Sequence, residues 1–158
     1  MYYYKYKTNI GDLYISASDK YILSISYFKE ANLKKIETPL IKQAYTQITA
    51  YLNDELKEFN LPIEIVGSDF EKTVYKHLMT VPYGQVISYK QLAKMIDNEK
   101  AARAVGGALN KNPLSIVVPC HRVIASNNDL TGYAGGLDIK IKLLEIEGLK
   151  IVNNKVVK

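Results

Sequence analysis

Reactive and metal-binding side chains are scarce in this sequence of 158 residues, which has one cysteine, two histidines and no tryptophan. A single cysteine cannot form a disulfide within the chain, so the sequence indicates a reducing compartment and we expect the cytoplasm. A structural zinc site needs more Cys and His ligands than this chain contains. No glycine-rich cofactor motif is present either. We therefore expect neither a metal nor a cofactor.

Long apolar runs are also absent. None approaches the roughly 18–20 residues of a membrane helix, and residues 1–5 lack the apolar core of a signal peptide. With 9 Gly and 5 Pro the chain is neither collagen-like nor of low complexity, and a hydrophobic fraction of 47% excludes disorder. The sequence predicts a globular protein of one domain or two small ones, a monomer with no membrane partner.

Charge is distributed unevenly along the chain. Residues 1–66 carry 8 basic and 8 acidic side chains, and residues 67–158 carry 13 basic and 8 acidic ones. The net charge of +5 therefore lies entirely in the second part, which also holds both arginines, both histidines and the cysteine. The first part holds nine of the thirteen tyrosines. A basic domain with all the reactive side chains favours an anionic partner, nucleic acid first.

Residues 1–66 are predicted to form a small β-sheet with one helix. Alternating apolar residues indicate strands at 2–6, 13–17 and 21–27, the last two forming a hairpin. Thr38-Pro39 opens a helix, because Thr caps a helix and Pro suits its first turn. A short extended segment follows at 61–65.

Residues 67–158 are predicted to form a mostly helical domain. Ser68 or Asp69 caps one helix, and two short helices at 89–96 and 99–109 form a helix-turn-helix pattern. An apolar strand at 116–119 leads to Cys120. A helix at 137–147 and a terminal hairpin at 150–157 complete the domain. The fold class is therefore α+β, a β-sheet-plus-helix domain (1–66) followed by a domain like a winged helix-turn-helix (67–158).

Cys120 is a candidate nucleophile because His121 follows it directly. A thiol of ordinary pKa is mostly protonated at neutral pH and needs a nearby base or cation. Neighbours on a strand point to opposite faces, so the pair requires a bend at Pro119 or a bridging water. Glu145 and Glu147 are candidates for the acid that orients the histidine. The alternatives are an inert buried thiol and a core histidine.

Residues 119–123, Pro-Cys-His-Arg-Val, resemble the active-site motif of the O6-alkylguanine-DNA alkyltransferases. Residues 81–89 are similar to the segment that enters this family's helix-turn-helix, and residues 101–108 resemble its recognition helix. Further matches in the same order are Asn112-Pro113, residues 133–137 and Glu147-Gly148. The first half of the chain matches only loosely, through residues 10–13.

The resemblance implies direct and irreversible transfer of an alkyl group from guanine O6 in duplex DNA to Cys120, once per protein molecule. It implies that His121 takes the thiol proton through a water and that Glu147 orients His121. Tyr89 matches the residue that gives a proton to the leaving guanine, and Asn112 matches one that buttresses the active-site turn. O4-alkylthymine is a further substrate that the resemblance leaves open.

The resemblance also implies a DNA surface and a substrate pocket. Arg103 matches the arginine that fills the stack once the damaged base has been flipped out. Small residues let the recognition helix lie close to the minor groove. The expected DNA contacts are Ser88, Ala102, Arg103, Gly106, Gly107 and Arg122, and the expected pocket residues are Pro119, Val123, Tyr133, Ala134, Gly135 and Gly136. The family often has Ser at the position of Ala134, so one side-chain contact is missing there.

Three other functions compete with this interpretation. Alkyltransferase-like proteins recognise alkylated DNA without reacting, but they replace the nucleophilic cysteine that is present here. A transcription regulator would need a separate DNA-reading domain, for which 158 residues leave no room. A Cys-His hydrolase would need an oxyanion motif, and none stands out.

Overall fold

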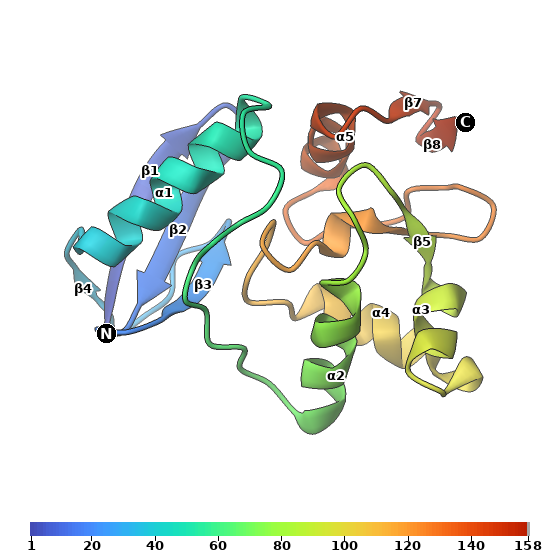
Figure 1. Cartoon of the computed structure of the whole chain (residues 1–158), viewed down its shortest axis with the longest axis horizontal. Coiled ribbons are helices and arrows are strands. Elements are labelled where there is room, and N and C mark those ends of the chain that lie inside the picture. The colour runs from blue at the N-terminus through green and yellow to red at the C-terminus, as the bar shows by residue number, and fades with distance from the viewer. Residues whose placement is uncertain (158) are drawn as a thin grey trace. The chain divides into compact units, whose positions relative to one another are not determined.

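The computed structural model describes residues 1–157, which form an α+β fold of two compact units. Unit 1 consists of residues 1–66 with 113–116, and unit 2 of residues 67–112 with 117–158. Figure 1 shows strands β1 to β4 and helix α1 in the first unit, and helices α2 to α5 in the second. The predicted fold class is confirmed.

Unit 1 is a four-stranded sheet with one helix. Strands β1 (Tyr2–Thr8), β2 (Gly11–Ala17), β3 (Ile22–Ser26) and β4 (Lys34–Lys35) lie in the order β3-β2-β1-β4. The pairs β1–β2 and β2–β3 are antiparallel, and β4 is parallel to β1.

Helix α1 (Pro39–Leu52) covers one face of this sheet (Figure 1). The Thr38 side chain accepts a hydrogen bond from the amide of Ile41 at 3.2 Å, so it caps the helix as predicted. Fully buried Leu13 and Ile15 from the sheet and Ile41 and Ile48 from the helix belong to the core. The period-2 pattern of the strands and the helical period of α1 account for this layer.

Helices α2 (Asp69–Leu78) and α3 (Tyr89–Met95) in unit 2 both begin with a capping box, at Ser68 and Ser88. A 3₁₀ turn at Glu99–Ala101 leads into α4 (Ala102–Asn110), which contacts α2 and α3. The predicted helix-turn-helix pair is therefore α3 and α4.

The rest of unit 2 surrounds Cys120. Strands β5 (Ile87–Ser88) and β6 (Val123–Ile124) pair in parallel, and α5 (Leu137–Ile146) precedes the hairpin of β7 (Lys150–Val152) and β8 (Lys155–Val157). The helix predicted at 137–147 and the terminal hairpin are confirmed. Within residues 1–157, none of the helices has the length and apolar character needed to cross a bilayer.

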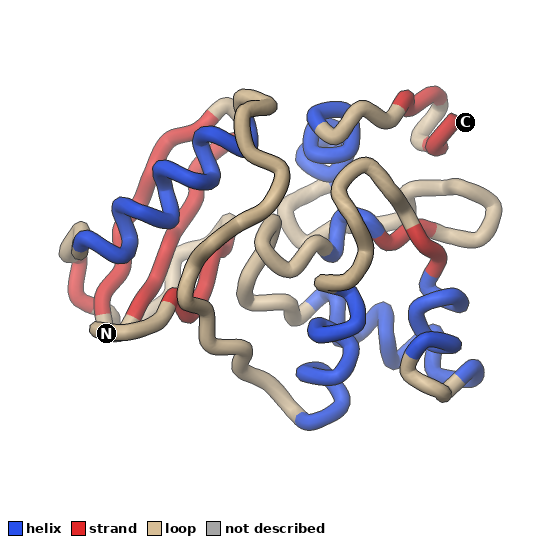
Figure 2. Tube along the Cα trace, in the orientation of Figure 1, coloured by secondary structure: helices blue, strands red, loops and turns tan. Residues whose placement is uncertain are grey.

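The strand predicted at residues 116–119 is wrong. This segment consists of turns, drawn as loop in Figure 2, and Ile116 has a φ of 75°, which no strand residue adopts. Residues 113–116 belong to unit 1, where the amide of Ile25 donates to the carbonyl of Pro113 at 2.8 Å. The run is apolar because it is buried, although its backbone is irregular.

Candidate active site

Cys120 is the first residue of a 3₁₀ turn, Cys120–Arg122, and is 6% exposed. The side-chain amide of Asn112 donates to the carbonyl of Val118 at 2.9 Å, just before the cysteine. The amide of Cys120 donates to the same carbonyl at 2.8 Å. Asn112, at the end of α4, therefore contacts the turn that presents the thiol, as the sequence predicts.

Cys120 and His121 lie in a 3₁₀ turn, whereas on a strand their side chains would point to opposite faces. Successive side chains of such a turn are about 120° apart, so Cys120 and His121 do not point to opposite faces. His121 is fully buried, and its Nε2 lies 2.7 Å from Oε2 of Glu147. Of the two candidate acids, Glu147 makes this contact, whereas Glu145 is exposed.

The structure corrects the prediction that Arg122 contacts DNA. Arg122 is 7% exposed, and its Nε and Nη2 donate to the two oxygens of Glu147 at 2.9 and 3.0 Å. Its Nη1 donates to the carbonyl of Val81 at 2.7 Å. Because a buried carboxylate needs a charged or hydrogen-bonded partner, Arg122 supports Glu147 from below the surface.

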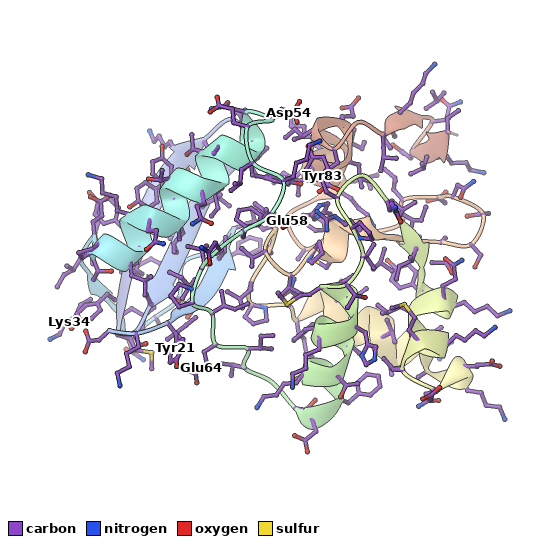
Figure 3. The ribbon with its side chains drawn as sticks, in the orientation of Figure 1. Tyr21, Lys34, Asp54, Glu58, Glu64 and Tyr83 are labelled. Atoms are coloured by element: carbon purple, nitrogen blue, oxygen red, sulfur yellow. The ribbon has the colours of Figure 1, made fainter. Side chains whose placement is uncertain are left out.

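The loop before β5, with Tyr83 and Gly84, also contacts the cluster of His121, Arg122 and Glu147. The amide of Gly84 donates to Oε1 of Glu147 at 2.9 Å. Tyr83, labelled in Figure 3, donates its hydroxyl proton to the carbonyl of Ile146 at 3.0 Å, and its ring lies 5.9 Å from the Arg122 guanidinium. Glu147 is thus fixed by His121, Arg122 and Gly84 together.

Burial keeps both reacting groups neutral at rest. It raises the pKa of the Cys120 thiol, and the hydrogen bond from Asn112, the charge of Lys140 and a hydrogen bond from Tyr133 oppose that rise. Burial lowers the pKa of His121, and the contact with Glu147 opposes that change. The resting pair is therefore a thiol and a neutral imidazole, with the carboxylate ready to stabilise an imidazolium.

Lys140 is a functional candidate that no sequence motif indicates. The residue is 1% exposed on α5, and its Nζ donates to the carbonyls of Val123 at 2.8 Å, Leu130 at 2.5 Å and Gly132 at 3.3 Å. Burial lowers its pKa to about 8. The available signal was its place three residues after Leu137, on the apolar stripe of the helix.

Tyr89 lies beside α4 through its ring and contacts Thr131 through its hydroxyl. It is the first residue of α3, and its ring lies beside Gly106 of α4, where an added Cβ would be 3.9 Å away. Its hydroxyl lies 2.7 Å from Oγ1 of Thr131, a residue that none of the sequence motifs includes.

The outer face of α4 carries most of the predicted DNA contacts. Arg103 and Gly107 are exposed, and Ala102 and Gly106 are partly exposed. Within residues 1–157 no ion pair or hydrogen bond is assigned to the Arg103 guanidinium. Ser88 differs from these four: it is 8% exposed, and its hydroxyl accepts from the amide of Gln91 in the capping box, which makes it a helix cap.

The predicted pocket residues fall into two groups. Tyr133, Ala134, Gly135 and Gly136 lie in the loop before α5, with Ala134 and Gly136 exposed. Pro119 is buried beside Cys120, and Val123 is fully buried in β6. The side chain of Val123 therefore belongs to the core beneath the site, which corrects its placement as a pocket wall.

No metal-binding cluster lies among the described residues, and the groove beside α3 is not lined by Cys120. No group of three Cys, His, Asp or Glu side chains among the described residues is arranged to hold a metal ion. A groove of about 810 Å³ lies beside α3, but Cys120 is not among the residues that line it. The geometry defines a closed site with one thiol, a His–Glu–Arg cluster and an exposed helix-turn-helix face nearby.

A buried cysteine next to a His–Glu pair, in the same unit as a helix-turn-helix, is the arrangement expected of a DNA-modifying protein. Residues 69–149 match the family described as 6-O-methylguanine DNA methyltransferase, DNA binding domain, and residues 1–65 match its ribonuclease-like domain. The chain belongs to the 6-O-methylguanine DNA methyltransferase family, and the predicted resemblance is confirmed.

Known proteins similar to this chain include a methylated-DNA–protein-cysteine methyltransferase of Methanosarcina acetivorans, 42% identical over 94% of this chain and 99% of the relative. The Mycobacterium tuberculosis OGT, solved in complex with DNA, is 36% identical over 93% of this chain and 92% of that structure, with a TM-score of 0.86. A structure of Schizosaccharomyces pombe Atl1 with DNA containing O6-carboxymethylguanine is 31% identical over 55% of this chain, with a TM-score of 0.50.

Proposed function

We propose that this protein repairs duplex DNA by transferring the alkyl group of O6-alkylguanine to Sγ of Cys120, once per molecule. The observation that carries the proposal is the buried Cys120 turn beside the His121–Glu147 pair in a chain of this family. Similarity to methylated-DNA–protein-cysteine methyltransferases over nearly the whole chain supports it. The compartment is the reducing cytoplasm, which keeps the thiol reactive.

The reaction begins with removal of the thiol proton. Because Nε2 of His121 is occupied by Glu147, the proton goes to the other ring nitrogen, Nδ1, through a water. Glu147 stabilises the imidazolium, and Arg122 keeps Glu147 in place. The thiolate then attacks the alkyl carbon, so that an S–C bond forms while the C–O6 bond breaks and its electron pair leaves with the guanine.

The leaving guanine takes a proton from Tyr89. The Tyr89 hydroxyl lies between the helix-turn-helix and the loop at residues 131–136. A neutral leaving group departs more easily than an anion, so a proton donor at this position lowers the barrier. No metal or cofactor takes part in these steps.

The minor groove of the DNA binds to the exposed face of α4. Ala102, Gly106 and Gly107 let the helix lie close to the duplex, and Arg103 enters the stack where the damaged base has left. The basic residues of 67–158, the DNA-binding and transfer domain, attract the phosphates. Since Cys120 is 6% exposed, the loop with Tyr133, Ala134, Gly135 and Gly136 moves to admit the flipped base.

The experiment that tests this function measures protein mass. The protein is incubated with a duplex containing one O6-methylguanine, with an unmodified duplex as control. We expect an increase equal to one methylene group, located on the Cys120 peptide, and no increase in Cys120→Ser. Binding to the methylated duplex without a change in mass would instead identify a recognition protein that does not react. A parallel duplex with O4-methylthymine decides whether that base is also a substrate.

A further inference from the structure

Thr131 has a backbone conformation that its side chain disfavours. Its φ is 57°, and six of the eight non-glycine residues with positive φ in the described chain are Asn or Asp, which tolerate this region. A β-branched side chain there is strained, and such strain persists only when the surrounding structure imposes it. Gly132, the next residue, shows that this loop accommodates glycine. A threonine at residue 131 is therefore expected only if its side chain makes a contact that offsets the strain.

The surrounding structure holds Thr131 from both sides. The carboxylate of Asp129 accepts a hydrogen bond from the Thr131 amide at 3.0 Å. Nζ of Lys140 donates to the carbonyls of Leu130 and Gly132, the residues before and after Thr131. These contacts involve only the backbone of residues 130–132, so they fix the loop but do not require a hydroxyl group.

The hydroxyl of Thr131 contacts Tyr89. It donates to the carbonyl of Leu130 at 2.6 Å, and it lies 2.7 Å from the Tyr89 hydroxyl. Because a threonine hydroxyl has only one proton, which Thr131 donates to Leu130, Thr131 accepts a hydrogen bond from the Tyr89 hydroxyl. A chain of hydrogen bonds therefore runs from Tyr89 through Thr131 to the carbonyl of Leu130, which also accepts from the Lys140 ammonium.

We propose that Thr131 is a positioning residue that holds the Tyr89 hydroxyl for proton transfer to the leaving guanine. The inference rests on the proposed function. When Tyr89 gives its proton to guanine, the Thr131 hydroxyl turns from Leu130 to the phenol oxygen and stabilises its negative charge. Lys140 still satisfies the carbonyl of Leu130. The O–H bond of Tyr89 breaks, a bond from that hydrogen to the guanine forms, and the phenolate regains a proton from solvent.

The test compares variants that separate the hydroxyl from the shape of the side chain. Thr131→Val keeps the β-branch and loses the hydroxyl, whereas Thr131→Ser keeps the hydroxyl. We expect Thr131→Val to slow single-turnover methyl transfer from duplex DNA by about three- to tenfold, and Thr131→Ser to stay near the wild-type rate. The dissociation constant for DNA should be unchanged in both variants. Thr131→Gly relieves the backbone strain and should be as slow as Thr131→Val.

The Tyr89→Phe background shows whether Thr131 acts through the phenol. Adding Thr131→Val to Tyr89→Phe should cause no further loss, because the group that Thr131 holds is already absent. The inference is overturned if the two losses multiply, if Thr131→Val reacts at the wild-type rate, or if Thr131→Ser is as slow as Thr131→Val. Absence of transfer by the wild-type protein would overturn the proposed function itself, which is a distinct result.

Discussion

Two buried cations, Arg122 and Lys140, modify the pKa values of the groups around Cys120, whose largest shifts come from burial. Arg122 is paired with a carboxylate, whereas the hydrogen bonds of the Lys140 ammonium within residues 1–157 go to carbonyl oxygens. Burial lowers the pKa of Lys140 to about 8, and the charges of Cys120 and Asp129 oppose that change. The same positive charge favours a thiolate at Cys120. Lys140 therefore holds the loop at residues 130–132 and also lowers the pKa of the Cys120 thiol.

Replacing Lys140 should make the thiol less reactive. Lys140→Met removes the charge at similar length, so we expect the pKa of Cys120 to rise further. The measurement is the rate of Cys120 alkylation by iodoacetamide as a function of pH, whose midpoint should move to higher pH. Lys142→Met is the matched control, because Lys142 is exposed on the same helix, and its midpoint should stay at the wild-type value. Equal midpoints for Lys140→Met and the wild type would contradict this role.

Glu147 should matter for both stability and transfer. Glu147→Gln leaves the Arg122 guanidinium buried without its counter-charge, which costs about 3–5 kcal/mol of unfolding free energy. It should also slow methyl transfer by about 10- to 100-fold, since the imidazolium of His121 loses its stabilising charge.

The Glu147→Gln rate is measured with duplex DNA and with free O6-benzylguanine, and both should fall because the change affects the thiol and not the DNA. Glu145→Gln, two residues earlier and exposed, should change neither rate nor stability. If Glu147→Gln slowed the duplex reaction but left the reaction with free O6-benzylguanine unchanged, Glu147 would have no role in proton transfer from Cys120 to His121.

At the scale of the elements, variants on α4 test the proposed DNA contacts separately from the chemistry at Cys120. Arg103→Ala should slow transfer from duplex DNA by about tenfold or more, because the flipped state costs a few kcal/mol and would lose the side chain that we propose fills the gap. Reaction with free O6-benzylguanine should keep its rate. Lys100→Ala, in the 3₁₀ turn before α4, is the control: it should weaken binding and reduce its salt dependence without changing the rate at saturating DNA. Equal losses on both substrates for Arg103→Ala would exclude a role in base flipping.

Local signals in the sequence were sufficient for most helices of this fold. Thr38, Ser68 and Ser88 all cap helices as expected, since capping depends on residues within one turn. The apolar run at 116–119 was misassigned because burial alone does not distinguish a strand from a buried turn. The left-handed conformation of Ile116 depends on contacts of residues 113–116 with β3, which no local pattern records.

The candidate site was predictable only in part, for a similar reason. Cys120, His121 and Glu147 follow from a motif and its resemblance to a family. Arg122 and Lys140 have their charged groups buried, whereas such side chains are mostly exposed, so charge counting places them at the surface. Thr131 meets Tyr89 across 42 residues of sequence, a contact that only the folded chain creates.

At the scale of the whole molecule, the burial of His121 makes folding stability depend on pH. The pKa of His121 lies below its ordinary value of 6.5 in the folded state because burial disfavours the imidazolium. At pH values between its lowered and its ordinary pKa, His121 is protonated in the unfolded chain but not in the folded chain. The contribution of His121 to the unfolding free energy is therefore fully present above about pH 6.5 and is lost as the pH falls from there.

Urea unfolding at about pH 7.5 and about pH 5.5 measures this dependence, and the wild type should be less stable at the lower pH. His121→Gln keeps a side-chain donor toward Glu147 but does not titrate, so its stability should fall less than that of the wild type between the two pH values. The only other histidine, His77, is the matched control: it lies partly exposed on α2, and His77→Gln should show the same pH dependence as the wild type. If His77→Gln reduced the pH dependence and His121→Gln did not, acid sensitivity would arise on the surface of α2, and burial of the active-site imidazole would not be its cause.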